Sequence, residues 1–188
     1  MENPRQRSGD SGMTSLGDGT MVSKGSGRVS AYGAIDELDC FAGLARIEVL
    51  ESLPPGPDRD LAVRSLETVQ NACWLLAASL AAPGRECPEA PQIQAGIEQL
   101  AVEMERAAGP VSGFVIPGSS RAEALLHVAR AVCRRAERDV VELFGVLGDG
   151  AATGWELAVL NRMSSLLFAA SRLALKARGI PVSYRGRG

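Results

Sequence analysis

The sequence has few of the residues that build metal sites, disulfides or nucleic-acid-binding surfaces. It contains one histidine, His127, and four cysteines without a C-x-x-C pair. These ligands are too few and too scattered for a zinc site, so we interpret the cysteines as reduced, buried thiols. The formal net charge of −2 lacks the basic surplus that neutralises the phosphates of a nucleic acid. No nucleic-acid partner is therefore expected.

Aromatic residues and long apolar runs are also scarce. Aromatics make up 4% of a chain that is 46% hydrophobic, so alanine and leucine fill most of the interior, as suits close-packed helices. The longest apolar run, residues 72–82, is interrupted by Ser79 and is too short to span a bilayer. We recognise no signal peptide. We therefore expect a cytoplasmic protein without a membrane partner.

Helical periodicity begins at Arg28 and continues almost to the end of the chain. Residues 1–27 are rich in Gly, Ser, Asp and Thr and show no helical or strand period. Beyond them, proline- and glycine-rich breaks separate five predicted helices. These are residues 28–51, 58–82, 92–107, 120–147 and 154–178. The sequence therefore predicts an all-α fold, a five-helix up-and-down bundle domain (28–188) preceded by a Gly/Ser-rich N-terminal arm (1–27).

A carboxylate stands on an otherwise small and apolar face of the first predicted helix. At 100° per residue, Asp36 shares this face with Tyr32, Gly33 and Cys40. A buried carboxylate is costly unless it is paired or hydrogen-bonded. Two interpretations stay open: Asp36 forms a buried salt bridge, or this face meets water.

The fourth predicted helix carries a row of arginines. Arg130, Arg134 and Arg138 recur every four residues and therefore stack along one stripe. A charged stripe is ordinarily a solvated exterior, but guanidinium groups in line also suit carboxylate or triphosphate oxygens. The same stripe is expected to hold Glu123, His127 and Glu137.

The fifth predicted helix is apolar almost all round and is expected at the centre of the bundle. Asn161 interrupts it near one end. A buried amide needs hydrogen-bonding partners, so Asn161 is either a residue that specifies the bundle or a ligand contact.

The N-terminal arm offers many backbone N–H groups with little side-chain obstruction. Residues 7–15 (Arg-Ser-Gly-Asp-Ser-Gly-Met-Thr-Ser) can wrap phosphates, and Lys24 adds a positive charge. The arm is not a Walker A sequence. Its composition also fits a disordered tail.

Four ordered motifs resemble the PduO-type cob(I)alamin adenosyltransferases. The first is the arm from Arg7 to Leu16 with Val22-Ser-Lys24, and the second is Arg28-Val-Ser-Ala-Tyr-Gly-Ala-Ile-Asp-Glu-Leu38. The third joins Phe114-Val-Ile-Pro-Gly118, Leu126-His-Val-Ala-Arg130 and Cys133-Arg-Arg-Ala-Glu-Arg138, and the fourth is Leu160-Asn-Arg-Met-Ser164 with Leu167-Phe168. Together they cover nearly the whole chain.

This resemblance implies a homotrimer with an active site between neighbouring subunits. It implies that Asp36 and Arg130 form a salt bridge beside the corrinoid, that Phe114 occupies the lower face of cobalt, and that Arg134 is catalytic with them. It also implies a set of residues that bind ATP with Mg²⁺. These are Ser8, Gly9, Asp10, Gly12, Thr14, Ser15, Lys24, Arg134, Glu137, Arg138 and Asn161.

The implied reaction transfers the 5′-deoxyadenosyl group of ATP to cobalt. Phe114 would keep the nucleotide-tail base from ligating Co(II), which eases reduction, and Co(I) then attacks the 5′-carbon while triphosphate leaves. Catalysis would consist mostly of positioning and charge stabilisation. A reductase and a B12-dependent enzyme that receives the product are expected partners. Two other functions remain open, a carrier of adenosylcobalamin and a purely structural bundle.

The sequence also departs from the family's pattern at three places. Gln6 replaces a threonine and Gly17-Asp18 replaces a Phe-Gly pair. Both changes lie in the arm, so they predict weaker binding of the nucleotide or a less ordered arm. Ser165 replaces an aspartate one turn beyond Asn161, which predicts looser support around that amide.

Overall fold

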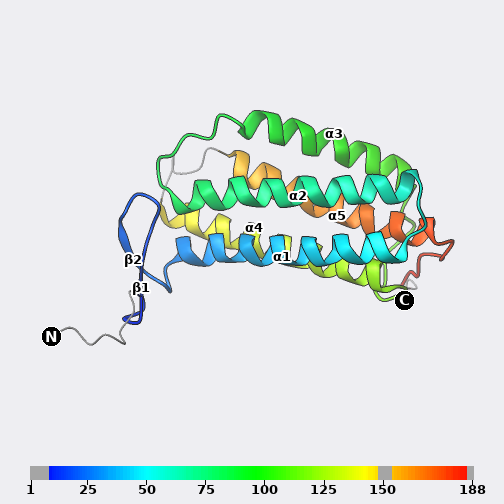
Figure 1. Ribbon diagram of the computed structural model, residues 1–188, viewed down its shortest axis with the longest axis horizontal. Coiled ribbons are helices and arrows are strands. Elements are labelled where there is room, and N and C mark those ends of the chain that lie inside the picture. Colours follow the sequence, from blue (N-terminus) through cyan, green and yellow to red (C-terminus); the bar gives the residue numbers. More distant parts are fainter. Residues whose placement is uncertain (1–8, 148–153, 186–188) are drawn as a thin grey trace.

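The computed structural model describes residues 9–147 and 154–185 as a bundle of five helices preceded by a small hairpin (Figure 1). The predicted all-α bundle is confirmed, and each observed helix begins and ends within two residues of its predicted range. The helices are α1 (Gly27–Ser52), α2 (Pro57–Ala81), α3 (Ala90–Ala108), α4 (Arg121–Leu147) and α5 (Trp155–Ala177).

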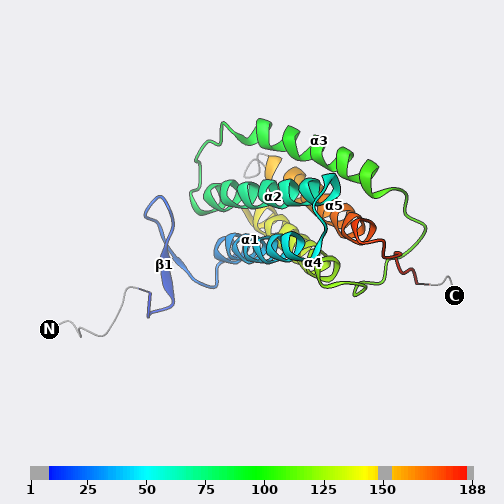
Figure 2. The same ribbon diagram turned by 45° about the vertical axis from the view of Figure 1, so that its right-hand side comes forward.

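Helix α5 lies at the centre, as its apolar composition predicts. It packs against α2, α3 and α4, whereas α1 packs against α2 and α4 (Figure 2). Leucines 160, 166, 167 and 173 of α5 are buried in the common core. Helix α5 therefore contacts three of the other four helices, and α1 and α4 pack directly against each other.

Helices α1 and α4 run antiparallel in close register. A β-carbon on Gly27, at the start of α1, would lie 3.9 Å from the Leu143 side chain near the end of α4. At the opposite end, Arg121 Nη2 lies 3.3 Å from Glu48 Oε2. The start of α4 and the start of α1 therefore lie at opposite ends of the bundle, which fixes where the parts of a site can be.

The arm contains two short strands that the sequence did not predict. Strands β1 (Met13–Ser15) and β2 (Met21–Ser23) pair antiparallel, with Thr14 opposite Val22. Three residues are too few to show an alternating pattern, so periodicity misses them. The hairpin lies beyond the α1 N-terminal end of the bundle (Figure 1).

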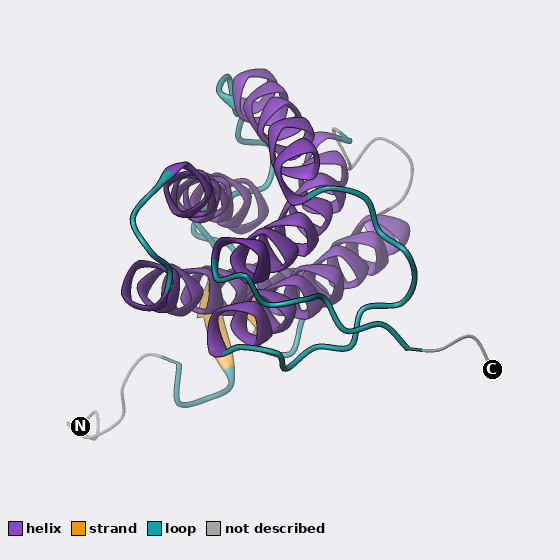
Figure 3. Cartoon of the chain, turned by 90° about the vertical axis from the view of Figure 1, so that its right-hand side faces the viewer, coloured by secondary structure: helices purple, strands orange, loops and turns teal. Residues whose placement is uncertain are grey.

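The α3–α4 connection and the C-terminal segment lie at the other end of the bundle, where they run side by side (Figure 3). Val115 and Tyr184 form an isolated antiparallel bridge. Ile116 N donates to Ser183 O at 2.8 Å, and Arg185 N donates to Phe114 O at 2.8 Å. The C-terminal segment therefore holds the loop that carries Phe114.

The expectation of four buried thiols is wrong for half of the cysteines. Cys73 and Cys133 are buried, but Cys87 is half-buried and Cys40 is exposed on α1. Burial raises the pKa of the Cys133 thiol to about 12, and its Sγ donates to Leu160 O. Among the described helices, none is both long and apolar enough to cross a membrane.

Candidate functional site

The arm places a glycine turn directly beside a lysine ammonium group. Gly12 N donates to Gly9 O, and Lys24 N donates to Gly12 O at 2.8 Å. Gly9 and Gly12 have φ values of +99° and +78°, which favour glycine. A β-carbon on Gly9 would lie 3.2 Å from Lys24 Nζ. The turn and the cation that the sequence predicted as phosphate contacts therefore lie together.

The remaining predicted arm residues follow the same hairpin. Asp10 and Ser15 are exposed and Thr14 is half-buried. Ser15 Oγ donates to Leu16 O at 3.0 Å. Ser8 lies outside the described residues.

Gly17, one of the departures from the family's pattern, docks the arm onto the bundle. Its N–H donates to Ala81 O, the last residue of α2, at 2.8 Å. A β-carbon there would lie 3.2 Å from Ala82 Cβ, so a side chain would force the two segments apart. Asp18 Oδ1 accepts from Thr20 N, which lowers the pKa of the Asp18 carboxyl. Gly17 and Asp18 therefore each support a tight turn in this chain.

The arginine row lies along α4 as predicted, and its second half is open to solvent. The Arg134 side chain is 52% exposed and its Nη1 is 3.9 Å from Glu137 Oε2. Arg138 is exposed and donates to Arg134 O, while Arg130 is half-buried over the Phe168 ring. Burial and the nearby Arg134 charge lower the pKa of Arg130. The row can accept an anion without first breaking a strong ion pair.

Asp36 lies on an uncovered face of α1. It is exposed together with Gly33 and Cys40, which agrees with the interpretation that this face of a single chain meets water. Among the described residues, no ion pair joins Asp36 to Arg130. The neighbouring Glu37 instead pairs with Arg135 of α4. The predicted Asp36–Arg130 bridge is therefore not formed within one chain.

Glu123 and His127 follow the helical spacing of the arginine stripe, but the ordinary interpretation of that stripe as a solvated exterior is wrong for these two residues. Glu123 is 0% exposed and His127 is 5% exposed. The stripe is covered at the start of α4, where the Phe114 loop and Phe168 of α5 lie against it. Helical periodicity places a residue on a face but does not say which segment covers that face.

Phe114 is 85% exposed in the α3–α4 loop. An apolar ring of this size is costly to leave in water, and it lies on a loop whose two ends are fixed by buried polar side chains. Arg172 of α5 donates to Gly109 O at the start of the loop. Glu123 accepts from Gly118 N and Ser119 N at its end. The ring is therefore presented to the outside from a fixed support.

Asn161 is exposed on the second turn of α5, so the interpretation as a buried, bundle-specifying amide is wrong. Ser164 and Ser165 donate to its main-chain carbonyl at 2.9 and 3.4 Å. The interpretation of the Asn161 side chain as a ligand contact stays open.

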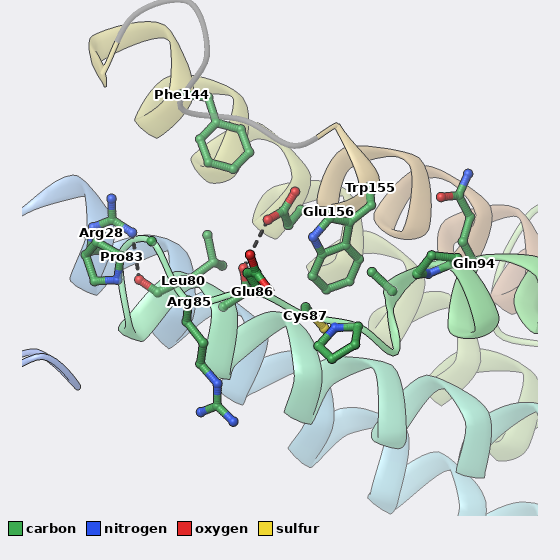
Figure 4. A pocket seen from close by; sticks show the side chains of 15 residues that line it. Arg28, Leu80, Pro83, Arg85, Glu86, Cys87, Gln94, Phe144, Trp155 and Glu156 are labelled. Carbon is green, nitrogen blue, oxygen red and sulfur yellow. Dashed lines mark hydrogen bonds between the residues drawn. The ribbon is translucent and has the colours of Figure 1, made fainter.

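A cavity of about 880 Å³ lies at the arm end of the bundle, between the α2–α3 connection and the start of α5 (Figure 4). None of the predicted site residues lines it. Three of its polar side chains are bonded to one another or to the main chain: Arg28 Nη1 donates to Leu80 O, and Ser79 Oγ donates to Glu156 Oε1. We therefore place the candidate site on the open α1–α4 face and not in this cavity.

The donors available for a metal ion are few. Among the residues that the structure describes, no group of three or more His, Cys, Asp or Glu side chains could hold one.

Fold and site together define a helical-bundle protein that combines a glycine-rich hairpin with an arginine row and an exposed aromatic residue. Residues 5–174 match the family model described as cobalamin adenosyltransferase. A cobalamin adenosyltransferase from Cupriavidus metallidurans is 38% identical over 92% of this chain and 88% of its own. A corrinoid adenosyltransferase from Bacillus subtilis is 35% identical over 93% and 87%.

Solved structures agree with these relatives. A variant of the PduO-type ATP:corrinoid adenosyltransferase from Lactobacillus reuteri, complexed with cobalamin and ATP, superposes with a TM-score of 0.80. It is 25% identical and covers 97% of this chain and 96% of its own. The chain belongs to the cobalamin adenosyltransferase family, and it is a transferase that moves the adenosyl group of ATP to cobalamin.

Proposed function

We propose that this adenosyltransferase assembles each active site from two copies of the chain. One copy supplies the arm with Lys24, and the other supplies the arginine row. Asp36 of one copy pairs with Arg130 of its neighbour, and Phe114 lies against the cobalt of cob(I)alamin. The products are adenosylcobalamin and triphosphate.

The observation that carries this proposal is the separation of the arm from Phe114. The hairpin lies at the α1 N-terminal end and the Phe114 loop lies at the opposite end (Figures 1 and 2). Helix α4, which runs between them, has 27 residues and is therefore about 40 Å long. Transfer requires the 5′-carbon of ATP to reach cobalt, so an arm and a Phe114 at opposite ends of one chain are unsuited to serve the same reaction.

The uncovered α1–α4 face supports assembly with further copies. Leu44 and Ile47 of α1 and Val128 and Val141 of α4 are exposed. Exposed apolar side chains on two helices, one of which also carries the exposed Asp36, are typical of a surface that another subunit covers. We propose a homotrimer because a closed ring of three places each arm beside the next arginine row.

The order of residues along α4 matches the two substrates. Arg130 lies toward the Phe114 end and Arg138 toward the hairpin end, with Arg134 and Glu137 between them. In the proposed site Arg130 faces the corrinoid, while Arg134, Arg138 and Lys24 stabilise the negative charge that develops on the departing triphosphate. Asn161 orients the nucleotide. Mg²⁺, bound through the phosphates, adds charge neutralisation.

Phe114 acts before the transfer. A large ring at the lower face of cobalt excludes the nucleotide-tail base and water from that position. Without an axial donor, the electron-accepting orbital of Co(II) lies lower in energy, so reduction to Co(I) becomes easier. The residue therefore serves reduction more than the alkylation that follows.

We also propose a cytoplasmic enzyme that receives electrons from a reductase and passes its product to a B12-dependent enzyme. The four cysteines are free thiols, which favours a reducing compartment.

Mixing two inactive variants tests the two-chain site. Lys24→Ala removes the arm cation and Arg134→Ala removes the row cation, so each variant alone should be nearly inactive. After random exchange of subunits in a trimer, about a quarter of the sites would combine an intact arm with an intact row. Formation of light-sensitive adenosylcobalamin should recover to about that fraction of wild type.

A site within one chain predicts no recovery, because every chain in the mixture lacks one of the two cations. Mixing each variant with itself is the matched control. Absence of recovery in a mixture shown by mass spectrometry to contain both variants in one oligomer would overturn the proposal.

A further inference from the structure

We propose that Glu123, acting partly through His127, positions both groups that face the corrinoid: the loop that carries Phe114 and the guanidinium of Arg130. This inference rests on the roles proposed above for Phe114 and Arg130. Glu123 and His127 touch neither substrate in this scheme and are positioning residues.

The first connection runs from Glu123 to the Phe114 loop. Glu123 Oε2 accepts from Gly118 N at 2.8 Å and from Ser119 N at 3.0 Å. The side chain is fully buried, so both bonds form away from water and are stronger than exposed ones. They replace the return bond of an ordinary capping box, in which the Glu side chain would accept from the N–H of Ser120. The carboxylate therefore fixes the chain four residues after Phe114.

The second connection runs from Glu123 to His127, one turn further along α4. Glu123 Oε1 lies 3.1 Å from His127 Nε2. The two atoms are close but are not aligned for a hydrogen bond. Neither atom has another hydrogen-bonding partner among the described residues. Two buried polar atoms at this distance satisfy each other by a small rotation, and an uncompensated pair would be costly.

The third connection runs from His127 to Arg130. Arg130 Nε donates to His127 Nδ1 at 3.4 Å. Because Nδ1 accepts, the proton of the neutral ring is on Nε2, the atom that faces Glu123. The carboxylate therefore selects the tautomer, and the tautomer provides the acceptor that holds Arg130.

The ring of Phe168 closes this cluster from α5. Its centroid lies 6.0 Å from the His127 ring and 6.0 Å from Arg130 Cζ. Arg172, which fixes the start of the Phe114 loop, lies 5.2 Å from the same centroid. Both ends of the loop and the corrinoid-facing arginine are thus attached to one buried cluster, which explains a fully buried carboxylate in a bundle that does not need one for packing.

The tautomer of His127 tests the inference without any activity measurement. His127 is the single histidine of the chain, so its imidazole nitrogens give one set of signals in a protein without a histidine tag. Long-range ¹H–¹⁵N spectra of the wild type at pH 8 should show the proton on Nε2. A proton on Nδ1 would overturn the inference, because Nδ1 could not then accept from Arg130.

The variant Glu123→Gln separates the two roles of the carboxylate. The amide oxygen can still accept from Gly118 N and Ser119 N, but the amide N–H₂ then faces His127 Nε2. We expect the proton to move to Nδ1 and Arg130 to lose its acceptor. The KM for cob(I)alamin should rise about tenfold, while the KM for ATP stays at the wild-type value.

Glu48→Gln is the matched control. Glu48 is a buried carboxylate at the same end of the bundle that pairs with Arg121, and within the described part of the chain no hydrogen bond or ion pair joins it to the Phe114 loop or to His127. Its KM values should match those of the wild type. Equal increases for both substrates in Glu123→Gln, or no increase, would overturn the inference, because a purely structural role does not single out the corrinoid.

These outcomes distinguish the inference from the proposed function. A wild-type chain that forms no adenosylcobalamin overturns both. An active wild type with an unaltered Glu123→Gln variant overturns the inference alone. Should the variant fail to fold, the tautomer in the wild type still decides.

Discussion

The two halves of α4 carry similar polar side chains but place them in opposite environments. Glu123 and Arg134 are 134 − 123 = 11 residues apart, about three helical turns, so they point in nearly the same direction. Glu123 is fully buried with its partners inside the chain, whereas the Arg134 side chain is half-exposed with a 3.9 Å contact to Glu137. Direction alone therefore does not explain the difference.

The difference comes from what lies against the helix. The first half is covered by the Phe114 loop and by Phe168 of α5, and the second half faces the uncovered side of the bundle. Polar groups that are satisfied within one chain organise that chain. Polar groups that remain open on the same stripe are available for a ligand or a neighbouring subunit.

The largest effect is expected in the open half. Arg134→Ala should lower kcat/KM about a hundredfold, because it removes charge stabilisation of the leaving triphosphate. The free energy of unfolding should change by less than about 0.5 kcal/mol, since the side chain is half-exposed and has one long ion pair. Initial rates of light-sensitive product and urea unfolding measure the two quantities.

Arg135→Ala is the control for this comparison. Arg135 is the next residue of α4 and pairs with Glu37 within the chain, so its loss removes the same charge from a satisfied position. Its kinetics should remain near wild type. Equal losses in the two variants would mean that overall charge, and not the position in the row, determines the rate.

The next largest effect is expected at the Phe114 loop. This loop covers the first half of α4 but exposes the Phe114 ring to the outside. Phe114→Ala should slow product formation from Co(II) and a reductant about tenfold more than the reaction of pre-reduced Co(I). The residue is 85% exposed, so the fold should tolerate its loss. The two assays run on one preparation, and equal losses in both would contradict a role in excluding the axial base.

The open half of α4 was predictable from the sequence and the covered half was not. The spacing of Arg130, Arg134 and Arg138 is visible in the sequence, and the last two are exposed in the part of the chain that the structure describes. The burial of Glu123 depends on the α3–α4 loop, which has no period, and on Ser183–Arg185, which pair with it from the far end of the chain. Contacts between distant irregular segments leave no local pattern.

The same limit applies to the arm and to Asn161. The glycine turn was predicted from composition, but its position over Lys24 depends on a hairpin with three-residue strands. Asn161 interrupts an apolar helix, which favours burial, yet it lies on the second turn, where the bundle no longer covers the side chain. Composition identified both features, and only the packing of neighbours decides their exposure.

The smallest effect tests the covered half by pH. Burial lowers the pKa of His127, Arg130 lowers it further, and Glu123 opposes both. Because the folded pKa lies below the unfolded value of about 6.5, the unfolded chain binds more protons as the pH falls through 6.5. The free energy of unfolding should therefore decrease below about pH 6.5, by at most about 1.4 kcal/mol per pH unit.

His127 is the one histidine of the sequence, so this window is free of other imidazoles and lies above the ordinary range of carboxyl groups. A His127→Gln variant should lose the slope between pH 6.5 and pH 5 while keeping the decline that carboxyl groups cause at lower pH. A wild-type stability that is flat across this window would mean that His127 accepts a proton as easily in the folded chain as in the unfolded one. That result would place its imidazole in water and remove the contrast between the two halves of α4.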